Sequence, residues 1–186
     1  MFARSDVPLV VLGIDPGLSR CGYAVVHSYG PRRVRAVALG VLSTPREDEL
    51  PHRLAELRRE LAALIAEAKP DVVAVEHVFF QVNVRTAMSV GQASGLALAE
   101  ASAAGCEVVQ YTPNQVKETV TGYGAADKAQ VQRMVQARLG LTTPPKPADA
   151  ADAAALALCH LAFAPMRRSV RNALDAKAGR AAGSIA

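Results

Sequence analysis

The distribution of apolar and polar residues along the chain predicts alternating strands and helices. Short apolar runs with the length and β-branched content of strands cover residues 9–14, 20–27, 32–42, 71–76 and 107–111. The runs 9–14 and 71–76 are apolar almost throughout, which is typical of strands buried on both faces. The first two runs are joined across Asp15-Pro16-Gly17, which is a turn sequence. We therefore expect them to pair as a hairpin.

Helical periodicity occurs in the segments between these runs. Residues 54–68 place a row of leucines on one face, and Lys69-Pro70 is expected to end this helix. Small residues dominate the next helix, over 85–104. Further helices are predicted after the cap Thr112-Pro113, over 127–139 and over 148–163. This order of elements predicts one α/β domain with a mixed sheet.

The length of the chain and the distribution of its charge indicate one domain followed by a basic tail. Its 186 residues, 51% of them hydrophobic, are enough for one domain with its own core. We expect this domain to cover residues 9–164, after an extension of residues 1–8 and before a basic, disordered tail of residues 165–186. The tail carries the whole formal excess charge of +4, so overall basicity says little about nucleic-acid binding.

Two broad classes of protein are disfavoured by composition. No apolar run is long enough to cross a membrane, and the N-terminal residues lack the apolar segment of a signal peptide. The cysteines Cys21, Cys106 and Cys159 are odd in number and lack metal-binding spacing. Unpaired, scattered cysteines are typical of a reducing compartment, so we expect a cytoplasmic protein.

Four acids occupy positions that are unusual for purely structural carboxylates. Asp15 and Glu76 each end an apolar strand, whereas Asp149 and Asp152 share one face of an alanine-rich helix. Taken alone, Asp15 could be a turn residue and Asp149 a helix cap. Glu76 is harder to explain structurally, because glutamate is uncommon in strands and is rarely buried unpaired.

If the fold brings these acids together, they need a counter-charge, because ionised carboxylates repel one another. Ligand sets made only of oxygen favour Mg²⁺, with Mn²⁺ as a substitute, over zinc. Two such ions about 3.5–4 Å apart can activate a water and stabilise the leaving oxygen in phosphodiester hydrolysis. The acids therefore predict a two-metal nuclease.

Several short motifs stand in a fixed order along residues 9–163. They are Gly13-Ile-Asp-Pro-Gly17 with Gly22-Tyr23, Val75-Glu-His-Val-Phe79 with Asn83, Gly91-Gln-Ala-Ser-Gly95, Gln115-Val-Lys117, and Ala148-Asp-Ala-Ala-Asp-Ala153. Together they resemble the RuvC family of crossover-junction (Holliday-junction) endodeoxyribonucleases, which belongs to the RNase H-like superfamily. The resemblance implies an RNase H-like α/β fold, with a central five-stranded mixed sheet flanked by helices.

The resemblance also implies roles for individual residues. Asp15, Glu76, Asp149 and Asp152 match the catalytic acids that bind the metal. The residues expected to contact DNA are Phe79, Phe80, Asn83, Lys117 and Lys128. Two adjacent phenylalanines in a chain with only 4% aromatic residues suit stacking on unpaired bases, and the sequence leaves open which ring does so.

The activity implied by the resemblance is paired, symmetric, metal-dependent cleavage of four-way DNA junctions during homologous recombination and repair. A homodimer is implied as well, and the helix over 85–104 is our candidate for part of its interface, because paired nicks need two sites related by a two-fold axis. The implied partners are junction DNA and a branch-migration motor complex of the RuvA/RuvB type. The protein would then associate with the nucleoid when bound to DNA.

Two other functions remain open at this point. An actin-like or sugar-kinase-like phosphotransferase also places an aspartate and a glycine after its first strand, but it would need a second phosphate loop and an adenosine motif. A non-catalytic junction-binding protein with the same fold is the second alternative. The presence of all four acids argues against it.

Overall fold

The computed structural model describes residues 7–77 and 84–183, and within these ranges the strands form one mixed sheet. The strands are β1 (Leu9–Asp15), β2 (Arg20–Ser28), β3 (Val34–Ser43), β4 (Val72–Glu76) and β5 (Glu107–Tyr111). Their order is β3-β2-β1-β4-β5, and β1 pairs antiparallel with β2 and parallel with β4. The expected five-stranded mixed sheet is confirmed, with β1 at its centre.

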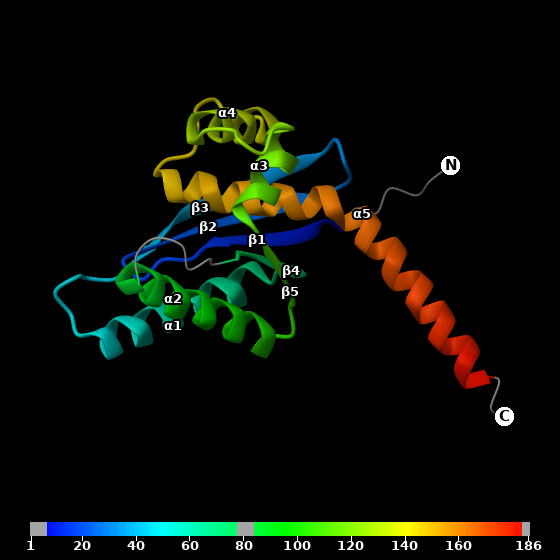
Figure 1. Cartoon of the computed structure of the whole chain (residues 1–186), viewed down its shortest axis with the longest axis horizontal. Coiled ribbons are helices and arrows are strands. Elements are labelled where there is room, and N and C mark those ends of the chain that lie inside the picture. Colours follow the sequence, from blue (N-terminus) through cyan, green and yellow to red (C-terminus); the bar gives the residue numbers. More distant parts are fainter. Residues whose placement is uncertain (1–6, 78–83, 184–186) are drawn as a thin grey trace.

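Helices cover both faces of this sheet (Figure 1). One face carries α1 (Leu50–Ala68) and α2 (Val84–Ala103), and the other carries α3 (Pro113–Thr121), α4 (Lys128–Leu139) and α5 (Ala148–Gly183). Because side chains alternate along a strand, β1 contributes to both cores. Leu12 and Ile14 pack toward α1 and α2, whereas Val11 packs toward α5.

Two capping boxes determine where α3 and α4 begin. The expected cap at Thr112 is confirmed: its hydroxyl accepts a hydrogen bond from the Gln115 amide at 3.2 Å, and the Gln115 side chain accepts one from the Thr112 amide at 2.9 Å. Asp127 and Gln130 form the same arrangement at the start of α4. These bonds satisfy amide groups that a helix start otherwise leaves unpaired. They also set Lys128 in the first turn of α4.

Helix α5 lies unusually close to the backbone of β1 and β2. A Cβ atom built on Gly13 would overlap the carbonyl oxygen of Ala153, and one built on Gly22 would overlap that of Asp149. The facing turns of α5 are made of alanines that are fully or almost fully buried. Small residues on both elements therefore let the start of α5 rest directly on the sheet.

The C-terminal segment differs from the expected disordered tail, because α5 continues to Gly183. Figure 1 shows its last turns extending away from the rest of the molecule. The expectation rested on the shortage of large apolar residues, but an alanine-rich segment can extend a helix that is already anchored by packing. Pro165 lies within the helix without ending it. No helix in the described part of the chain is long and apolar enough to cross a membrane.

We expect Gly13→Ala to lower the free energy of unfolding by about 3 kcal/mol, because the new methyl group would meet backbone atoms that cannot rotate away. Urea denaturation followed by circular dichroism would measure this. The matched control is Gly124→Ala, whose Cβ would have no atom within 4 Å and should leave stability almost unchanged. Equal denaturation midpoints for the two variants would contradict this account of the packing.

Candidate active site

Asp15 and Glu76 lie side by side at one edge of the sheet. The parallel register pairs Ile14 of β1 with Val75 of β4, and each acid is the next and last residue of its strand. Both acids also point to the face that α5 covers. They follow Val11 and Val72, which belong to the α5-side core, in steps of two residues, and alternate residues of a strand share a face.

Asp149 and Asp152 lie at the same end of the sheet, on the helix α5 that packs over it. They occupy the first turns of α5, and the contact of the Asp149 carbonyl with Gly22 holds this end of the helix on β2. Their side chains are 31% and 28% exposed. Both carboxylates act electrostatically on Asp15, as Glu76 does. The fold therefore gathers the four predicted acids at one end of the sheet.

The pKa values of the two strand acids are raised by burial and by the neighbouring carboxylates. Burial, and after it the negative charges of Glu76, Asp152 and Asp149, raises the pKa of Asp15 from 3.8 to about 8. Burial likewise raises the pKa of Glu76, against a hydrogen bond from Asp15 that lowers it. At neutral pH a proton therefore remains between these two carboxyl groups. A bound cation would remove the need for that proton.

Two basic side chains balance the acids of α5. The Lys128 ammonium lies 3.4 Å from Oδ2 of Asp152, and this carboxylate is the main cause of the raised pKa of Lys128. Arg20 donates to Oδ2 of Asp149 from Nε at 2.9 Å and from Nη2 at 2.7 Å. The sequence interpretation did not single out Arg20. The sequence feature that could have identified Arg20 is its position two residues before Gly22 in the same strand. This spacing places both residues on the α5 side of β2.

The residues present fit a hard divalent cation. All four donors are carboxylates, which are the ligands that Mg²⁺ and Mn²⁺ prefer. Burial and the neighbouring carboxylates both raise the pKa of Asp15, and a bound cation would offset these two effects. In the described ranges, no three His, Cys, Asp or Glu side chains could hold a metal ion as they stand. In this arrangement the two acids of α5 are engaged by Arg20 and Lys128. Metal binding would therefore require these ion pairs to rearrange.

The expected DNA-contacting residues are only partly placed. Lys128 lies within the acidic cluster, and Lys117 lies on α3, which starts just after β5 at the same edge of the sheet. Phe79, Phe80 and Asn83 lie outside the described residues.

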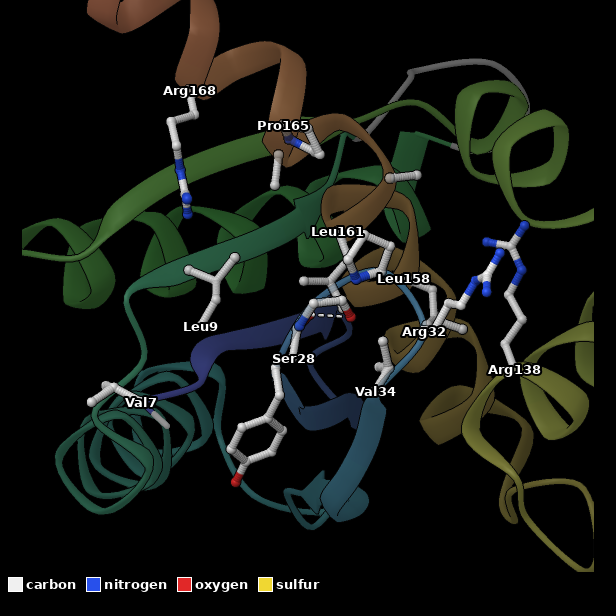
Figure 2. Close-up of a pocket in the computed structure, with 15 residues that line it drawn as sticks. Val7, Leu9, Ser28, Arg32, Val34, Arg138, Leu158, Leu161, Pro165 and Arg168 are labelled. Carbon is white, nitrogen blue, oxygen red and sulfur yellow. Dashed lines mark hydrogen bonds between the residues drawn. The ribbon is translucent and has the colours of Figure 1, made fainter. Parts of the chain in front are cut away.

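A cavity of about 960 Å³ lies at the opposite end of β1 (Figure 2). Its walls come from the first residue of β1, Leu9, from Ser28 and Val34 on the neighbouring strands, and from Leu161 on α5. Its basic lining residues are Arg32, Arg138 and Arg168. None of the described residues that line this cavity carries a carboxylate, and the four acids of the cluster are not among them.

We expect the metal-free protein to lose at least about 1 kcal/mol of stability as the pH rises from 4 to 9, because of Asp15. Between pH 3.8 and about 8 the folded state keeps a proton on Asp15 that the unfolded chain releases. Stability therefore falls with rising pH in this window. Urea denaturation in EDTA at several pH values would measure the change.

Asp15→Asn should flatten this pH dependence and make the metal-free protein more stable than the wild type at pH 8 or above. Asp48→Asn, which changes an exposed acid before α1, is the matched control and should leave the dependence as it is. An unchanged slope in Asp15→Asn would show that another group causes the loss.

The fold and site together define a class of protein. A mixed sheet in this order, with acids at the ends of β1 and β4 and on the helix packed over them, is the arrangement of RNase H-like, metal-dependent nucleases. The comparisons with known proteins then identify the family within that class.

A family model described as "Crossover junction endodeoxyribonuclease RuvC" matches residues 11–160. The RuvC protein of Salinispora arenicola is 53% identical over 171 residues, which cover 92% of this chain and 95% of that protein. The structure of Thermus thermophilus RuvC in complex with Holliday junction substrate superimposes with a TM-score of 0.80 at 37% identity, covering 85% of this chain and 96% of that one. The chain belongs to the RuvC family.

A more distant structure supports the fold alone. The yeast mitochondrial Holliday junction resolvase Ydc2 is 17% identical, with a TM-score of 0.65, and the match covers 90% of this chain and 86% of that one. Family membership confirms the resemblance noted in the motifs and argues against the phosphotransferase alternative.

Proposed function

We propose that this protein resolves four-way (Holliday) DNA junctions by paired, symmetric, metal-dependent phosphodiester hydrolysis, in homologous recombination and DNA repair. The observation that carries the proposal is the convergence of four carboxylates at one end of the sheet, in a chain of the RuvC family. The complex of Thermus thermophilus RuvC with a Holliday junction supports junction DNA as the substrate. The expected location is the cytoplasm, at the nucleoid when DNA is bound.

Asp15, Glu76, Asp149 and Asp152 are the residues that would hold two Mg²⁺ ions, with Mn²⁺ as a substitute. When bound, such ions activate water and stabilise the leaving oxygen of a phosphodiester. The protein supplies the charge and the position of its four ligands. Asp15 must lose its proton before it can act as a ligand, and Asp149 and Asp152 must exchange their basic partners.

Lys117 and Lys128 are proposed to contact the DNA backbone near the acids, where charge supplies most of the affinity. The roles proposed for Phe79, Phe80 and Asn83, at the unpaired bases of the junction, rest on the family resemblance. A branch-migration motor complex of the RuvA/RuvB type is the proposed protein partner.

The proposed homodimer uses α2. Ala93, Ala97 and Ala101 bury one side of this helix in the core, whereas Gly91 and Gly95 have open space where a Cβ would stand. Small residues on a helix face with such open space among the described residues allow a second helix to approach closely. A two-fold pairing along α2 would present the two active sites together, as symmetric nicking requires.

Replacing a carboxylate by its amide should abolish cleavage while junction binding survives. We expect Asp15→Asn, Glu76→Gln and Asp152→Asn each to slow cleavage of a synthetic four-way junction by at least about 100-fold, because each removes a metal ligand. Gel assays with Mg²⁺ would measure cleavage, and fluorescence anisotropy would measure binding. Glu67→Gln, an exposed glutamate of α1, is the matched control.

A linear duplex of the same sequence serves as the substrate control. Paired nicks on the junction and none on the duplex would support the proposal. Near-normal cleavage by any of the three amide variants would show that the replaced residue is not a metal ligand, and equal cutting of both substrates would contradict junction selectivity.

We expect Gly95→Arg to convert a dimer into a monomer, because a charged side chain would occupy the open face of α2. The helix itself should tolerate the change, since arginine favours helix by about 0.7 kcal/mol over glycine. Sedimentation equilibrium would measure the mass. Ala63→Arg, on the exposed surface of α1, adds the same charge and should remain dimeric. A monomeric wild type at assay concentrations would rule out the dimer.

A further inference from the structure

Arg20 is the first residue of β2 and is paired with one of the proposed metal ligands. Its Nε and Nη2 groups both donate to the same oxygen, Oδ2 of Asp149, at 2.9 and 2.7 Å. The register of β2 explains this contact. Gly22, two residues later on the same side of the strand, lies against the Asp149 carbonyl, so Arg20 lies next to the Asp149 side chain.

This ion pair conflicts with the proposed role of Asp149. A divalent cation on either oxygen of this carboxylate would weaken its attraction for the guanidinium, and the like charges of the two cations repel each other at short range. Metal binding at Asp149 would therefore release Arg20. The side chain of Arg20 is 47% exposed, which leaves it room to turn toward solvent.

A released Arg20 would stand at the edge of a site whose substrate is a phosphodiester. Guanidinium groups bind phosphate oxygens with paired, charge-assisted hydrogen bonds, as Arg20 already binds a carboxylate oxygen with two donors. Lys128 interacts with more of the cluster than Arg20 does, because it acts on Asp15 and Glu76 as well as on Asp152. Arg20 contacts the rim of the cluster, through Asp149.

We infer that Arg20 contacts the DNA backbone and that bound metal controls its availability. Without metal, Asp149 holds the guanidinium; with a divalent ion on Asp149, Arg20 binds a phosphate of the junction. This inference rests on the proposed function, which supplies both the metal and the DNA. Because coupling between two ligands is reciprocal, Arg20 makes metal binding strengthen DNA binding and DNA binding strengthen metal binding.

The test measures junction affinity of the full chain by fluorescence anisotropy, in EDTA and in Ca²⁺, with gels to verify that the junction stays uncut. Arg20→Gln should leave the affinity in EDTA within about twofold of the wild type and reduce the affinity in Ca²⁺ about fivefold. The slope of log affinity against log salt in Ca²⁺ should become shallower by about 0.9, the loss of one phosphate contact. Arg20→Lys, which keeps the charge, should retain most of the affinity in Ca²⁺.

A second set of variants tests the role of Asp149 in holding Arg20. Asp149→Asn frees Arg20 without metal, so affinity in EDTA should rise about fivefold, and adding Arg20→Gln to that variant should remove the gain. Asp152→Asn is the matched control, because its partner is Lys128. Its effect in EDTA should be the same with arginine or glutamine at position 20.

Two outcomes would overturn the inference. Equal weakening by Arg20→Gln in EDTA and in Ca²⁺ would show a DNA contact that does not depend on metal. Wild-type affinity in both conditions, in a variant shown to be folded by thermal denaturation, would show an ion pair without a role in binding. The wild type measured in parallel separates this from the proposed function, which fails if the wild type neither binds nor cuts the junction.

Discussion

The start of α5 rests directly on the backbone of β1 and β2, and the geometry of the site depends on this contact. The helix can come so near only because Gly13 and Gly22 have no side chains and the facing helix residues are alanines. At this distance the acids of α5 stand over the ends of β1 and β4. A side chain at Gly13 or Gly22 would push the start of α5, and with it Asp149 and Asp152, away from these strand ends.

The contact also creates an electrostatic problem, which the metal-free protein meets with its own charges. Asp15 keeps a proton beside Glu76, while Arg20 and Lys128 neutralise Asp149 and Asp152. Under the proposed function, a divalent cation would replace the Asp15 proton and the two ion pairs. The metal-free site is therefore partly neutralised, and under the proposed function its ligands would have to be freed before a metal could bind. Such a site would tie substrate binding to metal occupancy, as we infer for Arg20.

Much of this could be predicted along the chain. Strands that end in Asp15 and Glu76 are visible as apolar runs, and the spacing of Asp149 and Asp152 shows that they share a helix face. The continuation of α5 beyond residue 163 was not predicted, because a shortage of core-forming residues does not stop a helix from propagating out of an anchored segment. Gly13 and Gly22 were noticed as parts of motifs, but their role in helix docking was not.

The sequence by itself determined the strands and helices up to residue 163, their order, the family and the four candidate acids, because these follow from local periodicity and from motifs. Only the tertiary structure decided which side chains pair within the site. Arg20 and Asp149 are 129 residues apart, and their ion pair exists because α5 docks on β2 at one particular height and rotation. Such a contact depends on the packing of two separate elements, and no periodicity within either one encodes it.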